Sequence, residues 1–254
     1  MAKKSLGERM KEFYELRFSY SLPRRVPVII RLDGKAFHTF TKGLDKPFSL
    51  LMMNAMMETT RELCKNIQGC SFAYSQSDEI SLLITDWEKL ETDGWFDYGV
   101  QKMCSVSASM ATLYFNRNFP EFDTYNEYEE KYWEALFDAR VFSMPKEDVL
   151  NYFIWRQQDA TRNAVQALGQ ANFSHDELQG KNASDIQEML FSQRGINFNE
   201  LRTVYKRGFS VEKIGFDFQG VDGEFNRRIW TINDEIGVFS KDEKFKEYMK
   251  QLLE

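Results

Sequence analysis

Strand and helix patterns alternate over the first 145 residues in an order that strongly constrains the sheet they can form. Apolar, β-branched runs bounded by glycine, proline or polar turns favour strands, and long runs of helix formers favour helices. The order is strand, helix, strand, strand, helix, strand, at residues 24–34, 49–67, 70–74, 79–85, 96–118 and 134–145. We expect Ser49 to cap the first long helix and residues 75–78 to form a hairpin turn.

This order is typical of the ferredoxin-like βαββαβ fold. Right-handed connections would place both helices on the same face of a four-stranded antiparallel sheet. We therefore predict an α+β domain over residues 1–145. Residues 146–254 contain several helix patterns and two strand-like pieces, at 203–211 and 227–233, so we expect a mostly helical second part packed on the first.

Charge and apolar patterning limit the classes of function. The 254 residues carry 39 acids and 33 bases, a net charge of −6, which argues against a dedicated nucleic-acid binder despite a few basic clusters. The start, MAKKSLGERM, has no apolar core of a secretory signal. The longest apolar stretch, VPVII, is far too short for a membrane span. We expect a cytoplasmic protein without a membrane partner.

Any metal chemistry must rest on carboxylates. The chain has only two histidines and three cysteines, and the cysteines form no CxxC pair. The pattern therefore argues against a zinc site and favours a hard cation with oxygen ligands, such as Mg²⁺.

The strongest candidate site is a pair of acidic segments. In a βαββαβ sheet the first and third strands are neighbours, so Asp33, at the end of one, should meet Asp78 and Glu79, at the start of the other. Strand alternation separates Asp78 from Glu79, and we expect Asp78 to be the direct partner of Asp33 and Glu79 to support them. Converging aspartates repel unless a cation lies between them, and two Mg²⁺ ions held by two acids suit nucleotidyl transfer. The alternative is that Asp33 caps a turn and that the other two acids decorate a hairpin tip.

The loop after Asp33 is a second candidate. Gly34 would let the backbone approach a phosphate, and the amides of Lys35, Ala36, Phe37 and His38 could cradle it. Lys46 could pair with a triphosphate and His38 could stack on a base. Alternatively, His38 is an ordinary partly buried ring and Lys46 an ordinary surface residue; no Walker A motif is present.

Five segments together resemble the tRNA-histidine guanylyltransferase family, over roughly residues 25–210. They are RLDGKAFHTFTKGLDKPFS, YSQSDEISLL, FDARVFSMP, WRQQDATRNAV and LQGKNASDIQEMLFSQRGINFNEL. The resemblance implies a catalytic domain, residues 1–145, similar to a polymerase palm, with residues 146–254 packed on it. It also implies an enzyme that uses ATP and GTP or another NTP to add nucleotides to the 5′ end of tRNA, and a homotetramer.

The resemblance also implies roles for single residues. Asp33 and Asp78 would bind two Mg²⁺ ions with the carbonyl of Gly34, and Glu79 would be a third essential acid. The loop from Lys35 to His38, with Lys46 and Ser77, would hold the incoming nucleotide, and Lys102 would lie near a second triphosphate site. The basic residues expected to contact tRNA are Arg156, Arg162, Lys206 and Arg207.

One position departs from the eukaryotic enzymes of this family. Thr161 stands where they carry the histidine of a His-Ile-Asn-Asn-type motif associated with untemplated guanosine addition. The chain therefore resembles the Thg1-like branch, which prefers templated repair of 5′-truncated tRNAs. The alternatives are a palm enzyme such as a nucleotidyl cyclase, which would act without tRNA, and a non-catalytic RNA-binding module, which would need no divalent ion.

Overall fold

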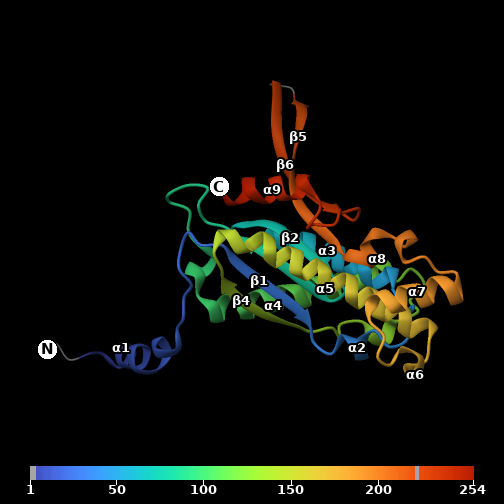
Figure 1. Ribbon diagram of the computed structural model, residues 1–254. Helices are drawn as coiled ribbons and strands as arrows, with labels where there is room; N and C mark the ends of the chain where they lie inside the picture. The colour runs from blue at the N-terminus through green and yellow to red at the C-terminus, as the bar shows by residue number, and fades with distance from the viewer. Residues whose placement is uncertain (1–3, 221–222) are drawn as a thin grey trace.

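A single twisted sheet forms the centre of the computed structural model, which describes residues 4–220 and 223–254 (Figure 1). The strands are β1 (Val28–Gly34), β2 (Cys70–Gln76), β3 (Glu79–Ile84), β4 (Phe137–Ser143), β5 (Phe209–Gly220) and β6 (Gly223–Asn233). Their order is β4-β1-β3-β2-β5-β6, and every neighbouring pair is antiparallel.

The α-helices are α1 (Leu6–Met10), α2 (Phe37–Phe40), α3 (Leu50–Asn66), α4 (Val100–Phe122), α5 (Lys146–Asn172), α6 (His175–Leu178), α7 (Ala183–Arg194), α8 (Thr203–Arg207) and α9 (Glu243–Leu253). Further helical turns are of other types: η1 (Lys11–Glu15) is a π-helix, and 3₁₀ turns are η2 (Leu16–Phe18), η3 (Trp95–Tyr98), η4 (Glu129–Lys131) and η5 (Phe198–Glu200). The predicted α+β class and the βαββαβ order of β1, α3, β2, β3, α4 and β4 are both confirmed.

The sheet is wider than the four strands that we predicted. β5 pairs with the free edge of β2, with Ser75 opposite Phe209 and Ala73 opposite Val211, and β6 then pairs with β5. Phe209 and Val211 are fully buried, so this extension also enlarges the core. The region after residue 145 is thus joined to the first part through one continuous sheet, and it contributes strands as well as helices.

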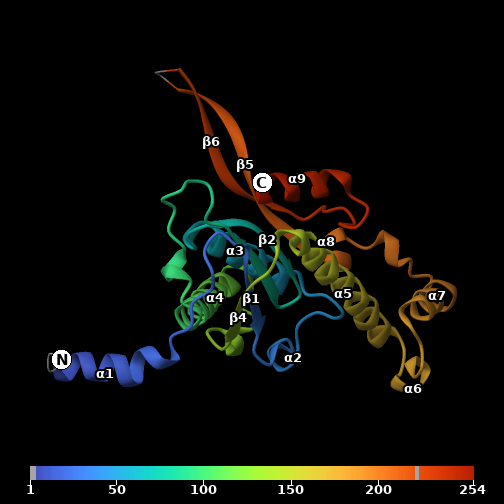
Figure 2. The same cartoon turned by 60° about the vertical axis from the view of Figure 1, so that its left-hand side comes forward.

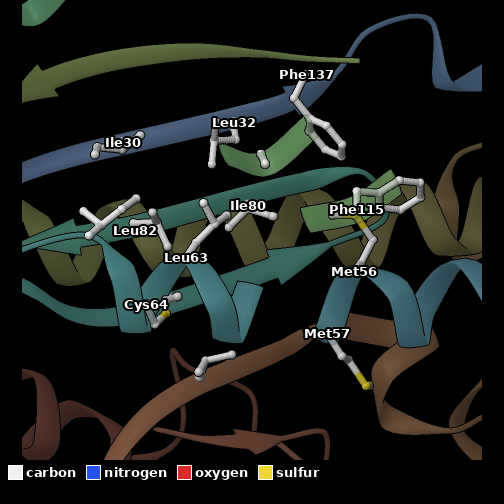
Figure 3. Packing of buried hydrophobic residues seen from close by; sticks show 14 of the residues in the cluster. Ile30, Leu32, Met56, Met57, Leu63, Cys64, Ile80, Leu82, Phe115 and Phe137 are labelled. Atoms are coloured by element: carbon white, nitrogen blue, oxygen red, sulfur yellow. The ribbon is translucent and has the colours of Figure 1, made fainter. Parts of the chain in front are cut away.

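Both faces of the sheet are covered, and strand alternation divides the side chains between them. Ile30, Leu32, Ile80 and Leu82 point to the face covered by α3 and α4, where they meet Met56, Leu63 and Phe115 (Figure 3). Ile29 and Leu83 point to the opposite face, where α5 and α9 pack. Burial on two faces explains why the strand residues read as a nearly continuous apolar run.

Local capping follows the sequence. The hydroxyl of Ser49 accepts a hydrogen bond from the amide of Met52 (3.3 Å) and caps α3, as predicted. At the end of α7, Gly195 adopts a left-handed conformation with φ of 65°, which glycine reaches without a steric cost.

Two segments project from this body (Figure 2). One is the β5–β6 ribbon. The other is the N-terminal segment α1–η2, which has no buried residue and exposes large apolar side chains, such as Phe18 at 84%. Within the described residues, no helix combines the length and the apolar character needed to cross a membrane.

Candidate active site

The turn between β2 and β3 lies at the end of the sheet where β1 finishes. Ser77 and Asp78 form this turn, between the paired residues Gln76 and Glu79, and Ser77 has a left-handed φ of 50°. The amide of Gly34 donates to the carbonyl oxygen of Asp78 over 3.1 Å. This bond holds the end of β1 against the turn, so the two acidic segments do meet.

Three acids belong to this region, with different surroundings. Asp33 is paired in register with Glu79, so both side chains leave the same face of the sheet. Burial raises the pKa of Asp78, and the nearby negative charge of Asp33 raises it further, although a backbone hydrogen bond opposes both. In the described residues neither Asp33 nor Asp78 forms an ion pair with a lysine or arginine.

The register differs from our expectation in one respect. We expected Asp78 to face Asp33 directly, but the residue opposite Asp33 in the ladder is Glu79. Asp78 belongs to the turn, where the alternation of an extended strand does not apply, and its carboxylate is close enough to Asp33 for the two charges to interact.

Glu79 is already neutralised by a helix from the later part of the chain. Arg156 of α5 donates from Nε and Nη2 to the two carboxylate oxygens of Glu79, at 2.6 and 2.7 Å. The side chains are only 7% and 10% exposed. Arg156 also donates to Asp159 at 3.2 Å. The prediction that Arg156 contacts tRNA is therefore corrected, because its guanidinium is buried and engaged by these acids.

Of the other three residues predicted to contact tRNA, one is buried and two are accessible. Lys206 is buried, donates to the carbonyl oxygen of Asn199 at 2.5 Å, and has its pKa lowered by burial and then by the charge of Arg207. It too is not a free surface cation. Arg162 is 64% exposed and pairs with Asp159, while Arg207 is half-buried. Arg162 and Arg207 are thus the two that remain accessible.

Lys102 does not lie at this end of the sheet. It is in the first turn of α4, whose N-cap Gly99 forms a β-bridge with Ser21. The ammonium of Lys102 lies 4.8 Å from the centroid of the Phe96 ring. The part of α4 near the acids contains Thr112, whose hydroxyl accepts from the amide of Phe137 at the start of β4. Lys102 and Thr112 are ten positions apart in the helix, about 15 Å along its axis.

The loop after Asp33 offers unpaired amides. Lys35 donates its amide to the carbonyl oxygen of Leu136 at 2.8 Å, so this amide is not available to a ligand. Ala36 has a left-handed φ of 55°, and the amides of Ala36, Phe37 and His38 have no acceptor among the described residues. Consecutive free amides of this kind suit an anion such as phosphate. The predicted cradle is thus reduced to three of its four amides.

Gly34 has a packing reason as well as the predicted role of close approach. A Cβ at this position would lie 2.3 Å from the ring of Phe37. That ring is buried and contacts Phe40, Phe115 and Phe137, at centroid distances of 5.0, 5.4 and 5.1 Å. The glycine therefore lets the aromatic cluster fix the amide loop directly beside the acids.

Two adjoining cavities flank the Ser77–Asp78 turn. The smaller, about 150 Å³, is lined by Asp78, Lys46 and Phe37. The larger, about 240 Å³, extends towards α5 and α8 and is lined in part by Asn163 and Tyr205. Four residues line both cavities, which therefore form one groove: Pro47, Ser49, Met52 and Ser77.

The donor set at the acids fits Mg²⁺. Among the described residues no three side chains of histidine, cysteine, aspartate or glutamate converge as a ligand cluster. Within the described part of the chain, Asp33 and Asp78 supply two hard carboxylates that pair with no lysine or arginine. Such a set suits Mg²⁺, which usually keeps several waters and is held by one or two carboxylates together with substrate phosphates.

Comparison with known proteins identifies the family. Residues 7–145 match the family model "Thg1: tRNAHis guanylyltransferase". The chain belongs to the tRNAHis guanylyltransferase family. It is accordingly a nucleotidyltransferase, as predicted, and its acids and groove lie within or beside the matched segment.

Similar proteins cover about three quarters of the chain or more. A bacterial tRNA(His) guanylyltransferase (Thg1)-like protein, solved in complex with ATP, is 43% identical over 98% of this chain and 99% of its own, with a TM-score of 0.87. The tRNA(His) guanylyltransferase of Schizosaccharomyces pombe is 32% identical over 214 residues, 76% of this chain and 78% of that protein. The Saccharomyces cerevisiae enzyme, at 22% identity and a TM-score of 0.67, shares the fold.

Sequence reasoning missed several residues that build the site. The partner of Glu79, Arg156, was instead expected to contact tRNA. The groove walls Met52 and Asn163 carry no local signal, since each sits in an ordinary helix pattern. Tyr205 lies in the piece predicted as strand-like, where the structure has α8. Their common feature, closeness to the Ser77–Asp78 turn, exists only after α3, α5 and α8 have packed.

Proposed function

We propose that this member of the tRNAHis guanylyltransferase family adds nucleotides in the 3′-to-5′ direction to the 5′ end of tRNA. The additions are templated by the opposite strand and serve to repair 5′-truncated tRNAs, with guanosine addition to tRNAHis as a second substrate reaction. The observation that carries the proposal is the meeting of Asp33 and Asp78 beside three free amides and a groove.

The proposed reaction has two transfers. The 5′-monophosphate of the tRNA first attacks the α-phosphate of ATP or GTP, and pyrophosphate leaves. The 3′-hydroxyl of the incoming NTP then attacks the activated 5′ phosphate, and the nucleoside monophosphate leaves. Where the tRNA already ends in a triphosphate, pyrophosphate leaves instead.

In this proposal the acids bind the metal ions and the loop after Asp33 binds the triphosphate. Asp33 and Asp78, with the carbonyl of Gly34, would hold two Mg²⁺ ions, which when bound lower the pKa of the attacking hydroxyl and neutralise the triphosphate. The amides of Ala36, Phe37 and His38 and the ammonium of Lys46 would bind the triphosphate oxygens, and Ser77 would line the site. Glu79 remains an essential acid that supports the pair.

The rest of the proposal concerns the tRNA and the assembly. Arg162 and Arg207 would contact the tRNA backbone near the larger cavity. Thr161 has no imidazole to support an untemplated addition, and its hydroxyl donates to the carbonyl oxygen of Gln157 at 3.0 Å. A cytoplasmic homotetramer fits the family, and the exposed apolar side chains of α1–η2 support contact between subunits.

A tRNA lacking its first nucleotide, offered with Mg²⁺ and labelled NTPs, tests the proposal. We expect 5′ extension only by the NTP complementary to the opposite base. Asp33→Ala and Asp78→Ala should abolish extension, because each removes a metal-binding carboxylate, while tRNA affinity stays near that of the wild type. Asp138→Ala is a matched control. Asp138 lies on β4 opposite Asp33, but it is 57% exposed and salt-bridged to Arg140. The extension rate of the Asp138→Ala variant should stay within a few-fold of that of the wild type.

The outcomes separate the alternatives. A cyclic nucleotide product without any need for tRNA would favour a cyclase-like palm enzyme. RNA binding with no extension at any divalent concentration would favour a non-catalytic module. Wild-type extension rates in Asp33→Ala or Asp78→Ala would refute the assignment of the two acids.

A further inference from the structure

Arg156 and Glu79 form a buried ion pair at the acid end of the sheet. Both nitrogens of the guanidinium edge bind both carboxylate oxygens, at 2.6 and 2.7 Å, so the carboxylate is fixed in position and orientation. The same Nη2 also donates to Asp159 at 3.2 Å. Glu79 is thereby oriented towards α5, whereas Asp78 borders the groove.

The docking of α5 on the sheet does not require this pair. One turn earlier on the helix, the hydroxyl of Tyr152 lies 2.8 Å from that of Ser81, two residues further along the same face of β3. Val149 and Phe153, both fully buried, pack α5 against that face as well. A buried ion pair adds little net stability compared with apolar packing, so its position beside the acids indicates a role in the site.

Without its partner, Glu79 would be a third free carboxylate in the site. It is the register partner of Asp33, and their side chains leave the same face of the sheet. The other cation near Glu79 is Arg31, which makes no hydrogen bond to it; the Nε of Arg31 has no partner among the described residues. A third carboxylate would bind a divalent ion more tightly and occupy positions that Mg²⁺ normally leaves to water and substrate phosphates.

We propose that Arg156 is a positioning residue that keeps Glu79 off the metal position, so that Asp33 and Asp78 alone bind the ions and leave room for the triphosphate. This inference rests on the two-acid metal site of the proposed function. The role of Arg156 is to restrain a neighbouring acid, and it contacts neither tRNA nor nucleotide.

Mn²⁺ binding to the nucleotide-free protein, followed by the electron paramagnetic resonance signal of free Mn²⁺, tests this role. Arg156→Met should lower the dissociation constant for Mn²⁺ at least about tenfold, because one more negative charge within about 5 Å of a divalent ion is worth more than a factor of ten. In the same variant kcat for 5′ extension should fall and should not recover with excess Mn²⁺ or Mg²⁺.

Two further variants isolate the effect. Adding Glu79→Gln to Arg156→Met should remove the gain in Mn²⁺ affinity, because the released carboxylate is then absent. Arg162→Gln is the matched control for Mn²⁺ binding: Arg162 pairs with the same Asp159 but does not contact Glu79, so its dissociation constant should stay unchanged.

Wild-type Mn²⁺ affinity in a folded Arg156→Met variant, judged by its far-ultraviolet circular dichroism, would overturn the inference. If that variant fails to fold, Arg156→Lys takes its place. A single ammonium cannot hold both carboxylate oxygens, so we expect a smaller gain in Mn²⁺ affinity, which Glu79→Gln should again remove. No gain in Arg156→Lys would equally overturn the inference. Asp78→Asn distinguishes the two levels. If the Asp78→Asn variant binds Mn²⁺ as tightly as the wild type does, the proposed metal site itself is wrong.

Discussion

Replacing Gly34 with alanine should damage both the core and the nucleotide loop. The added Cβ would lie 2.3 Å from one ring carbon of Phe37 and 2.6 Å from two others. The ring must withdraw by about 1 Å to reach ordinary contact at 3.4 Å, but Phe40, Phe115 and Phe137 surround it. Overpacking of this kind costs about 1–3 kcal/mol in the free energy of unfolding.

The site should respond because Phe37 supplies one of the free amides. We expect Gly34→Ala to lower the urea midpoint by the amount that corresponds to this loss, and to weaken GTP binding in a fluorescence titration at least tenfold. Adding Phe37→Leu, which removes ring atoms at the clash, should recover part of the lost stability. Gly7→Ala is the control, since nothing lies within 4 Å of a Cβ there. A Gly34→Ala protein with the wild-type midpoint and GTP affinity would refute this reasoning.

Two further variants report on other parts of the molecule. Burial raises the pKa of Asp78 in the folded protein, so without divalent ions the wild type loses stability as pH rises from the unfolded value of 3.8 through the folded pKa. Asp78→Asn, which does not titrate, should therefore be the more stable protein at pH 7, with a difference in thermal midpoint that disappears in acid; a difference independent of pH would contradict this. Leu63→Ala should cost about 2–5 kcal/mol in the free energy of unfolding, measured by urea denaturation, because Leu63 is fully buried between α3 and the sheet. Nucleotide affinity should not change, and a loss below 1 kcal/mol would mean that the core closes around the cavity.

The local pattern was enough to predict the elements of the first part and its topology. Ser49 caps α3 through a hydrogen bond three residues away, and the turn residues Ser77 and Asp78 lie between strands that alternate by the usual rule. These features depend on neighbours in the chain, so they can be read without the fold. The meeting of Asp33 with Asp78 needed one more step, the known strand order of βαββαβ sheets.

The errors concern contacts between distant segments. Only residues 209–211 of β5 lie in the predicted strand-like piece 203–211, whose first five residues form α8 instead. The pairing of β5 with β2 depends on the free edge that β2 presents, which no local period encodes. Lys102 was expected near a second triphosphate site, which stays a prediction; α4 places it about 15 Å along the helix from the turn that lies near the acids.

The sequence by itself determined the element order, the acidic pair and the family, because these reside in periodicity, turn chemistry and motif spacing. Strand alternation already separated Asp78 from Glu79, and the tertiary structure decided which group neutralises Glu79. Glu79 and Asp78 are adjacent in the chain, yet Glu79 faces Arg156 of α5 and Asp78 borders the groove. That difference arises when a helix beginning at residue 146 docks on the sheet, since an ion pair forms only where packing brings both charges together away from water.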